Sequence, residues 1–445
     1  MYAYDKKDSY TFSFSSADQF RLYLEQNGYH IPFSYDLSPL AAKKALSSRA
    51  GTITLENSLT VHPMEGFDGE TDGTPSELSR RRYLRFARSG AALIWSEAIS
   101  VVPEARTSDH QLMITEQNVA AYETLVKEMK KITKAPVIAQ LTHSGRFSKN
   151  SMTPHPLLAT RSLPFESVRP CDKDVPVVTD EYLDTLPDAY ARAASLAERA
   201  GFDGIDIKAC HGYLLSELLS AHTREGKYGG SFENRTRLLL DITDAVRAVL
   251  RPETVIASRL SVSDMIDYPY GFGVTETAPL SPDFSEAKKL IGILMEKGLT
   301  LIDMTMGSPY FNPHINRPYN KGGYLPPEHP LRGVERLIGA AKEIQAEFPS
   351  LTLIGTGYSY LREFAPYVAA GVLRDGGASL IGFGRMAFAY DGFAHDMITG
   401  HIDKNKVCIA CSKCTEIMRA GGTTGCPIRD QEIYLPLYRQ YCMKK

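Results

Sequence analysis

The pattern of hydrophobic positions along the chain predicts short buried strands that alternate with amphipathic helices. From about residue 55 onward, apolar runs are separated by longer segments with apolar residues at helical spacing, as in 187–201 and 231–250. The strands are expected at 58–64, 91–98, 136–143, 204–209, 254–261, 300–306, 352–357 and 379–384. Repeated βα units favour a parallel sheet, and eight of them close a barrel. We therefore predict an α/β fold with a TIM (β/α)8 barrel over residues 55–400.

Two segments lie outside the predicted barrel. Residues 1–54 are expected to form an N-terminal extension, and residues 401–445 a short Cys-rich tail. The Pro-rich segment 161–178 is expected to be a long loop at the barrel rim, where TIM barrels build their active sites.

The balance of charge excludes some classes of function. The chain has 50 Lys and Arg against 52 Asp and Glu, without the basic excess of a nucleic-acid-binding protein. The N-terminus has no apolar signal region, and no window reaches the roughly 18 apolar residues of a membrane helix. We expect a cytoplasmic protein with neither nucleic acid nor membrane as a partner.

Several predicted strands end on residues that can do chemistry. The stretch GIDIKACHGYL carries Lys208, His211 and Tyr213 at the end of the fourth strand. A Lys at such a position can act as a Schiff-base nucleophile or pair with a carboxylate, for which Glu65 is the candidate. Both interpretations remain open at this point.

The tail contains closely spaced thiols in the pattern C-x2-C-x2-C-x11-C, formed by Cys408, Cys411, Cys414 and Cys426. Four soft ligands suit either a [4Fe-4S] cluster or a tetrahedral zinc ion. Clustered thiols in a cytosolic protein favour a metal site over disulfides.

A set of short motifs follows the predicted strands in order: PME (63–65), SEA (96–98), QLTHSGR (140–146), HGYL (211–214), YGGSFENRTR (228–237), SRL (258–260) and GFGR (382–385). Together they resemble the Old Yellow Enzyme family of FMN-dependent ene-reductases, in particular the branch with 2,4-dienoyl-CoA reductase and trimethylamine dehydrogenase. The resemblance implies FMN at the barrel mouth, bound by Pro63, Met64, Glu65, Ala98, Gln140, Arg259, Gly355, Gly357, Gly384 and Arg385. The last four lie after the seventh and eighth strands, where TIM barrels commonly bind phosphate.

The resemblance also implies a reaction, in which flavin N5 gives a hydride to an activated C=C bond and Tyr213 gives a proton. Lys208 and His211 would polarise the neighbouring carbonyl. Lys208 stands where the family has His, and Glu65 where it has Thr, Cys or a small residue, so an ion pair between them is expected. His143, a lone strand-end histidine, is expected to be structural.

The branch binds a [4Fe-4S] cluster through a similar cysteine pattern, with one more residue between the second and third cysteines. Its members continue into a dinucleotide-binding half, whereas no G-x-G-x-x-G follows a strand in this chain. We therefore expect electrons from NAD(P)H directly or from a separate electron-donor protein. The substrate is expected to be a small enone or enoyl compound. The alternatives are a flavin dehydrogenase of amine-type substrates, a Schiff-base lyase using Lys208, and a non-catalytic electron-transfer subunit.

Overall fold

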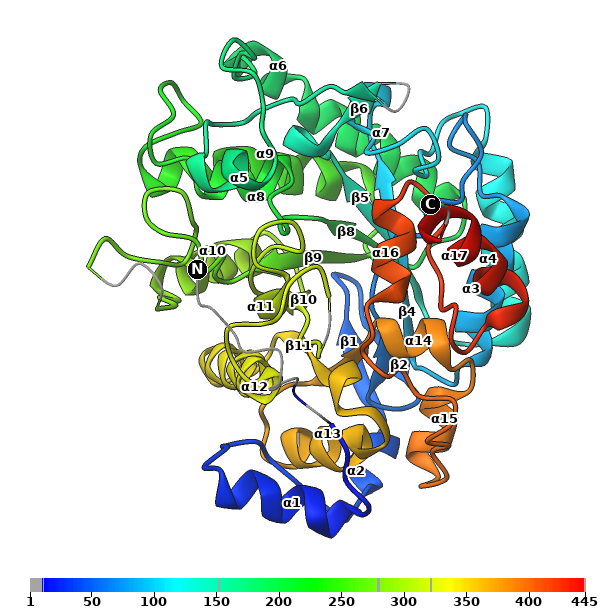
Figure 1. The fold of residues 1–445 in the computed structure, drawn as a ribbon. Helices are drawn as coiled ribbons and strands as arrows, with labels where there is room; N and C mark the ends of the chain where they lie inside the picture. The colour runs from blue at the N-terminus through cyan, green and yellow to red at the C-terminus, as the bar shows by residue number, and fades with distance from the viewer. Residues whose placement is uncertain (1–9, 11, 151–152, 278–280, 321, 444–445) are drawn as a thin grey trace.

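The computed structural model describes residues 10, 12–150, 153–277, 281–320 and 322–443, and at its centre lies a closed barrel of parallel strands (Figure 1). The strands are β3 (Leu59–Val61), β4 (Leu93–Ser100), β5 (Val137–Thr142), β8 (Gly204–Ile207), β9 (Val255–Ser261), β10 (Leu301–Thr305), β11 (Thr352–Gly355) and β12 (Leu380–Phe383). They pair in chain order, and β12 pairs with β3 to close the ring. Each matches one predicted run, which confirms the TIM barrel. Several strands are shorter than predicted because the last residues of those runs belong to rim loops.

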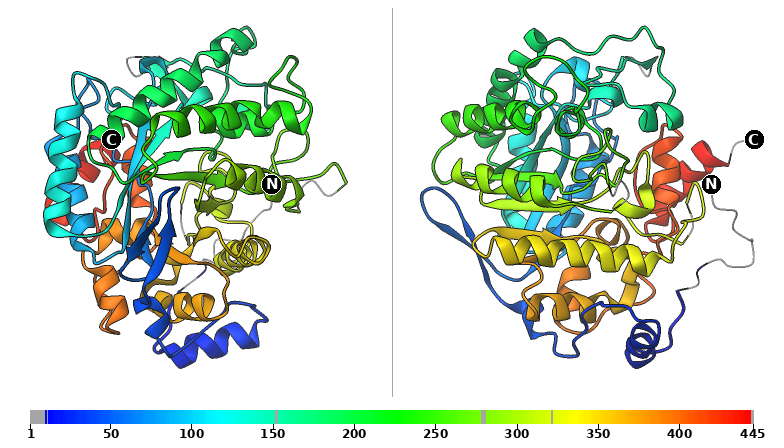
Figure 2. Two further views of the ribbon diagram at one scale, coloured as in Figure 1. Left: turned by 180° about the vertical axis from the view of Figure 1, so that it is seen from behind. Right: turned by 90° about the vertical axis from the view of Figure 1, so that its left-hand side faces the viewer.

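Helices follow the strands and cover the outside of the barrel (Figure 2). The long ones are α3 (Glu77–Arg88), α4 (Val119–Ile132), α7 (Leu186–Arg199), α9 (Phe232–Val249), α10 (Ser285–Glu296), α12 (Pro330–Glu347) and α13 (Ala365–Arg374). Shorter pieces join them to the strands: η1 (Pro103–Ala105), η2 (Gly145–Phe147), α6 (Asp180–Asp184), α8 (Leu214–Leu219), α11 (Pro313–Asn316), η3 (Tyr358–Phe364), α14 (Arg385–Ala389) and α15 (Phe393–Ile398). The predicted helices at 187–201 and 231–250 are α7 and α9, and Ser231 caps α9 by accepting from the Asn234 N–H.

A hairpin from the N-terminal segment closes the end of the barrel at which the strands begin. Its strands are β1 (Lys44–Ser47) and β2 (Thr52–Leu55), and they are antiparallel. Leu46 and Leu55 are buried in one apolar cluster with strand residues such as Trp95 and Leu301. The preceding helices α1 (Ala17–Gln26) and α2 (Ser38–Ala41) lie beside α13, and Phe20 stacks on Phe364 at 5.1 Å between ring centroids. The hairpin therefore covers this end of the barrel, and the strand ends at the opposite rim remain for a site.

The predicted rim loop 161–178 contains a helix, α5 (Leu163–Val168), so the expectation of an uninterrupted loop is wrong. Pro164 favours the first turn of a helix, and Glu166 accepts a hydrogen bond from the Ser162 N–H at 3.0 Å. A small hairpin of β6 (Lys149–Asn150) and β7 (Thr153–Pro154) precedes it. Residues 1–9 and 11 of the predicted extension, and 444–445 of the predicted tail, lie outside the described residues, as do 151–152, 278–280 and 321.

The tail folds back onto the barrel through α16 (Lys413–Arg419) and α17 (Gln431–Cys442), and α17 lies beside α3 (Figure 1). Arg81 on α3 donates two hydrogen bonds to the Asp430 carboxylate, at 2.7 and 2.9 Å. No helix in the described ranges is long and apolar enough to cross a membrane.

Candidate active site

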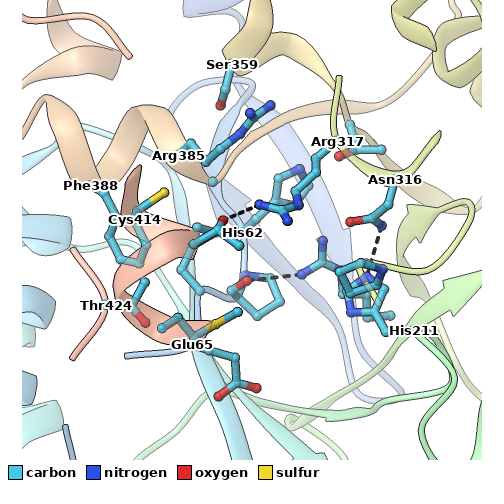
Figure 3. A pocket seen from close by; sticks show the side chains of 18 of the residues that line it. His62, Glu65, His211, Asn316, Arg317, Ser359, Arg385, Phe388, Cys414 and Thr424 are labelled. Atoms are coloured by element: carbon cyan, nitrogen blue, oxygen red, sulfur yellow. Dashed lines mark hydrogen bonds between the residues drawn. The ribbon is translucent and has the colours of Figure 1, made fainter. Parts of the chain in front are cut away.

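A cavity of about 1050 Å³, including space open to solvent, lies at the C-terminal ends of the strands (Figure 3). Its walls come from the ends of β3, β8, β9, β11 and β12, from the loop after β10, and from the tail. Most of the expected site residues line it: Pro63, Met64, Glu65, Lys208, His211, Tyr213, Arg259, Gly357, Gly384 and Arg385. Sequence positions more than 300 residues apart thus meet in one cavity.

Three expected flavin-binding residues, Ala98, Gln140 and Gly355, are not among the residues that line the cavity. Gln140 Nε2 donates to Asp206 Oδ2 at 2.6 Å, and Trp95 Nε1 donates to the same oxygen. This buried network explains why Gln140 is turned away from the cavity. The role of these three residues in flavin binding stays a prediction.

Lys208 and Glu65 form the expected ion pair, with Lys208 Nζ 3.7 Å from Glu65 Oε1. The same ammonium lies over the Tyr213 ring, 3.7 Å from its centroid. Burial lowers the pKa of Lys208 and raises that of Glu65, while their attraction opposes both shifts. The pair therefore places a cation against Tyr213.

His211 and Tyr213 follow β8 in a tight turn. His211 has a φ of +70°, a conformation that is uncommon for residues other than glycine. Burial, followed by the charges of Arg259 and Lys208, lowers its pKa well below the usual value, so the imidazole is neutral. Its Nε2 lies 3.1 Å from Asn316 Nδ2, and because an amide nitrogen can only donate, this contact favours the tautomer with the ring proton on Nδ1.

Tyr213 is a protonated phenol. Its hydroxyl lies 3.2 Å from that of Tyr310, and burial raises its pKa well above the usual value. A group that has to donate a proton must hold it until the reaction, and this environment keeps the proton on the phenol.

The opposite side of the cavity suits a phosphate. Among the described residues, Arg385 Nη1 and Arg317 Nε are buried without a hydrogen-bond partner. Gly357 adopts a φ of +101°, which strains any side chain there, and a Cβ at Gly384 would lie 2.6 Å from Met64 Sδ, so the flexible Met64 side chain would have to move. Unpaired guanidinium donors beside close-approach glycines fit the FMN phosphate.

Sequence reasoning missed Asn316, Arg317 and Tyr310. All three belong to the segment that follows β10. The run SPYFNPHINRPYN, polar and aromatic directly after a predicted strand, was the available signal. This run matches no motif, so its pattern does not distinguish one residue from another.

The four tail cysteines line a second, smaller cavity together with Arg385 and Phe388, which also line the larger one. Cys414 lines both, and Figure 3 shows it on the side of the cavity away from His211. The Ala410 N–H donates to Cys408 Sγ at 3.4 Å. No three His, Cys, Asp or Glu side chains in the described part of the chain are arranged to hold a single metal ion. Burial raises the pKa of Cys408 to about 11 and that of Cys426 to about 12, so metal binding would have to displace their protons.

His143 lies outside the cavity lining. Its Nε2 is 2.8 Å from the Tyr182 hydroxyl, and its Nδ1 accepts the Gly145 N–H at 3.1 Å. These contacts fit the structural role expected of it.

The barrel and its rim site define the class of protein as a TIM-barrel oxidoreductase of the flavin-binding type. A sequence profile of the NADH:flavin oxidoreductase / NADH oxidase family matches residues 49–306, more than half of the chain. The chain belongs to this family of flavin-dependent oxidoreductases, as the Old Yellow Enzyme motifs indicated.

A relative agrees with this assignment, and solved structures show the same fold. An NADPH dehydrogenase of Clostridium acetobutylicum is 34% identical over 224 residues, which are 50% of this chain and 63% of the relative. The chain thus spans less than two thirds of that relative. The fold is similar to that of 2-naphthoyl-CoA reductase, with a TM-score of 0.72, 16% identity, and coverage of 91% of this chain and 58% of that one. Morphinone reductase gives a TM-score of 0.61 at 23% identity, covering 82% and 91%.

Proposed function

We propose that the protein is an FMN-dependent ene-reductase that reduces an activated C=C bond next to a carbonyl. The observation that carries the proposal is that Tyr213 and His211 line the same cavity as Arg385 and Gly384, which belong to the side that suits a phosphate. When bound, FMN would supply a hydride to the β-carbon of the substrate.

The side chains of the chain would then control the charge and the proton. As the hydride arrives, negative charge develops on the carbonyl oxygen, and donors fixed beside that oxygen stabilise the transition state more than the ground state. Neutral His211 offers one donor, its Nδ1–H, and Lys208 offers an ammonium group. Tyr213 would protonate the α-carbon, and the cation over its ring would stabilise the phenolate left behind.

The ion pair with Glu65 separates this proposal from a Schiff-base lyase. A lysine nucleophile must be uncharged, and although burial lowers the pKa of Lys208, the Glu65 carboxylate 3.7 Å away opposes that shift and favours the protonated ammonium. Lys208 is therefore better suited to polarise a carbonyl than to attack one.

We further propose that NAD(P)H or a separate electron-donor protein reduces the flavin, and that the four tail cysteines bind a [4Fe-4S] cluster, with zinc as the alternative. Cys408, Cys411, Cys414 and Cys426 surround one space, and the Arg385 and Phe388 side chains separate it from the larger cavity. Four sulfur donors around one space suit a multi-iron cluster, whereas a single zinc ion would require the described side chains to move closer together.

The first experiment is purification without oxygen, followed by flavin, iron, sulfide and zinc analysis. The flavin reduced in the absence of oxygen is then mixed with 2-cyclohexenone, and the oxidised flavin is mixed separately with a tertiary amine. We expect bound FMN that is reoxidised by the enone in one turnover. A protein without FMN, or a flavin that only the amine reduces, would refute the ene-reductase.

A further inference from the structure

A second chamber adjoins the active-site cavity. Its volume is about 1140 Å³, including space open to solvent, and it shares Tyr310, Met418 and Arg419 with the first. Its other walls come from the loop after β4, from the rim segments around β6 and α5, and from the turn after α16. These segments are far apart in sequence and meet only in the folded chain.

The chamber is lined by cations. Lys149, Arg169 and Arg419 contribute positive charge, and none of its lining residues is Asp or Glu. Within the described ranges, none of the three forms an ion pair with a carboxylate, and Arg419 donates to the Pro309 carbonyl at 3.2 Å.

The pKa of Lys149 reflects the same excess of positive over negative charge. Its pKa is lowered by burial and by the like charge of Arg169, while Asp109 offsets only part of this. Gathering cations without counter-charges is unfavourable, and an anion in the chamber would relieve the repulsion.

Tyr310 forms the wall between the two spaces. Its hydroxyl lies 3.2 Å from that of Tyr213, and its ring stacks on Phe147 at 3.8 Å between centroids. The Arg169 guanidinium caps this stack, 5.1 Å from the Phe147 centroid and 5.5 Å from that of Tyr310. A ligand whose reacting end lies at Tyr213 can therefore extend past Tyr310 to the cations.

We propose that this second chamber binds a negatively charged arm, a phosphate or a carboxylate, of the ligand that reacts in the first cavity. The inference rests on the proposed function, because it takes the reacting end to lie beside His211 and Tyr213. The arm belongs either to the substrate or to a dinucleotide electron donor, and both present the same anionic chemistry to Lys149, Arg169 and Arg419.

The test uses the FMN-loaded enzyme and two double variants. K149M/R169M removes two chamber cations, and the matched control K131M/R192M removes one Lys and one Arg from the exposed faces of α4 and α7. The probes share one enal: 4-carboxycinnamaldehyde, its neutral methyl ester, and the phosphate ester of 4-hydroxycinnamaldehyde. Their dissociation constants are measured from the flavin absorbance without any reductant, so binding is read without turnover. The NADH and NADPH dependence of flavin reduction is measured separately.

We expect K149M/R169M to raise the dissociation constants of the charged probes by at least about tenfold and that of the methyl ester by less than twofold, because only a charged ligand pairs with these cations. K131M/R192M should change neither. A loss of affinity confined to the carboxylate, the phosphate ester or the dinucleotides identifies the source of the arm and still supports the proposed anion site. Equal losses of affinity for the methyl ester and the charged probes, or no loss for any anion, overturn the proposal.

If K149M/R169M fails to fold, K149M and R169M are tested singly by the same criteria. Tight binding of the charged probes to a wild-type enzyme that never reduces them would instead refute the ene-reductase and leave the chamber standing.

Discussion

The Lys208 ammonium lies 3.7 Å from the Glu65 carboxylate and 3.7 Å from the centre of the Tyr213 ring, so one cation joins the end of β3 to the proposed proton donor. Both charged residues are unusual for the family that the sequence resembles, and each compensates for the other. Replacing a neutral pair by an ion pair keeps the net charge of the site unchanged and adds a cation beside the residues proposed to bind the carbonyl.

The pair is expected to contribute to stability as a coupled unit. E65Q and K208M should each lower the free energy of unfolding by about 1–3 kcal/mol, and the double variant by less than the sum, since neither charge is then left unpaired. Urea unfolding of the four proteins measures the coupling. The exposed pair Lys43 and Glu56 gives the matched cycle, with an expected coupling below about 1 kcal/mol. Additive effects at Lys208 and Glu65 would show that the pair is not coupled.

Tyr213 is expected to act in the step that uses the enone and not in the step that loads the flavin with electrons. Y213F should slow reoxidation of reduced flavin by an enone about 10²–10⁴-fold, with little change in reduction by NAD(P)H. Stopped-flow absorbance separates the two half-reactions. Y310F, which removes only the neighbouring hydroxyl, should have a much smaller effect. Equal reoxidation rates in Y213F and the wild type would remove Tyr213 from proton transfer.

The tail cysteines are expected to act as one metal site. C408S, C411S, C414S and C426S should each lose most of the bound metal, which for a [4Fe-4S] cluster is about four irons per chain. C442S is the matched control, because Cys442 does not line the cysteine cavity and should keep the full content. Elemental analysis of anaerobically purified protein decides between iron and zinc. Metal retained in the four variants would show that these thiols are not its ligands.

The close approach of Met64 makes Gly384 sensitive to a single added methyl group. G384A should lower FMN occupancy and destabilise the protein by up to about 1 kcal/mol, because the Cβ would lie 2.6 Å from Met64 Sδ and push this flexible side chain toward the cavity. In G339A, on α12, the added Cβ meets no atom within 4 Å, so this control should be neutral or stabilising by up to about 1 kcal/mol. Flavin fluorescence after denaturation and thermal unfolding measure both quantities. Normal FMN content and stability in G384A would contradict the tight packing.

His143 is expected to make the free energy of unfolding fall as the pH falls. Burial lowers its pKa to about 3 in the folded protein, whereas an unfolded histidine titrates near 6.5. Below pH 6.5 the unfolded chain therefore binds a proton that the folded chain does not, and stability falls as the pH falls. Between pH 7 and 5 this loss is about 2 kcal/mol. Relative to wild type, H143Q should lose about that much less stability over this range, measured by urea unfolding at both pH values. The same pH slope in both proteins would show that His143 is charged in the folded state.

Much of the barrel could be predicted because it depends on local pattern. Alternation of apolar runs and helical segments reports which residues can be buried, and each strand contributes the same simple unit to the sheet. The turn from Lys208 to Tyr213 was also identified from sequence, since it directly follows a strand whose end had to lie at the rim. The helix at 163–168 was missed because its 6 residues are too few to produce a periodic pattern of apolar positions.

The sequence by itself determined the order of the strands, the end of the barrel at which the candidate site lies, and many of the residues that line its cavity. Only the tertiary structure decided what these side chains meet. In the folded chain Gln140 is hydrogen-bonded to Asp206, and Arg317 lines the same cavity as Arg385. Arg419 of the tail lines the second chamber together with Lys149 of the rim. Such contacts depend on how segments far apart in the chain pack against one another, and a local pattern of residues cannot predict which distant segments meet.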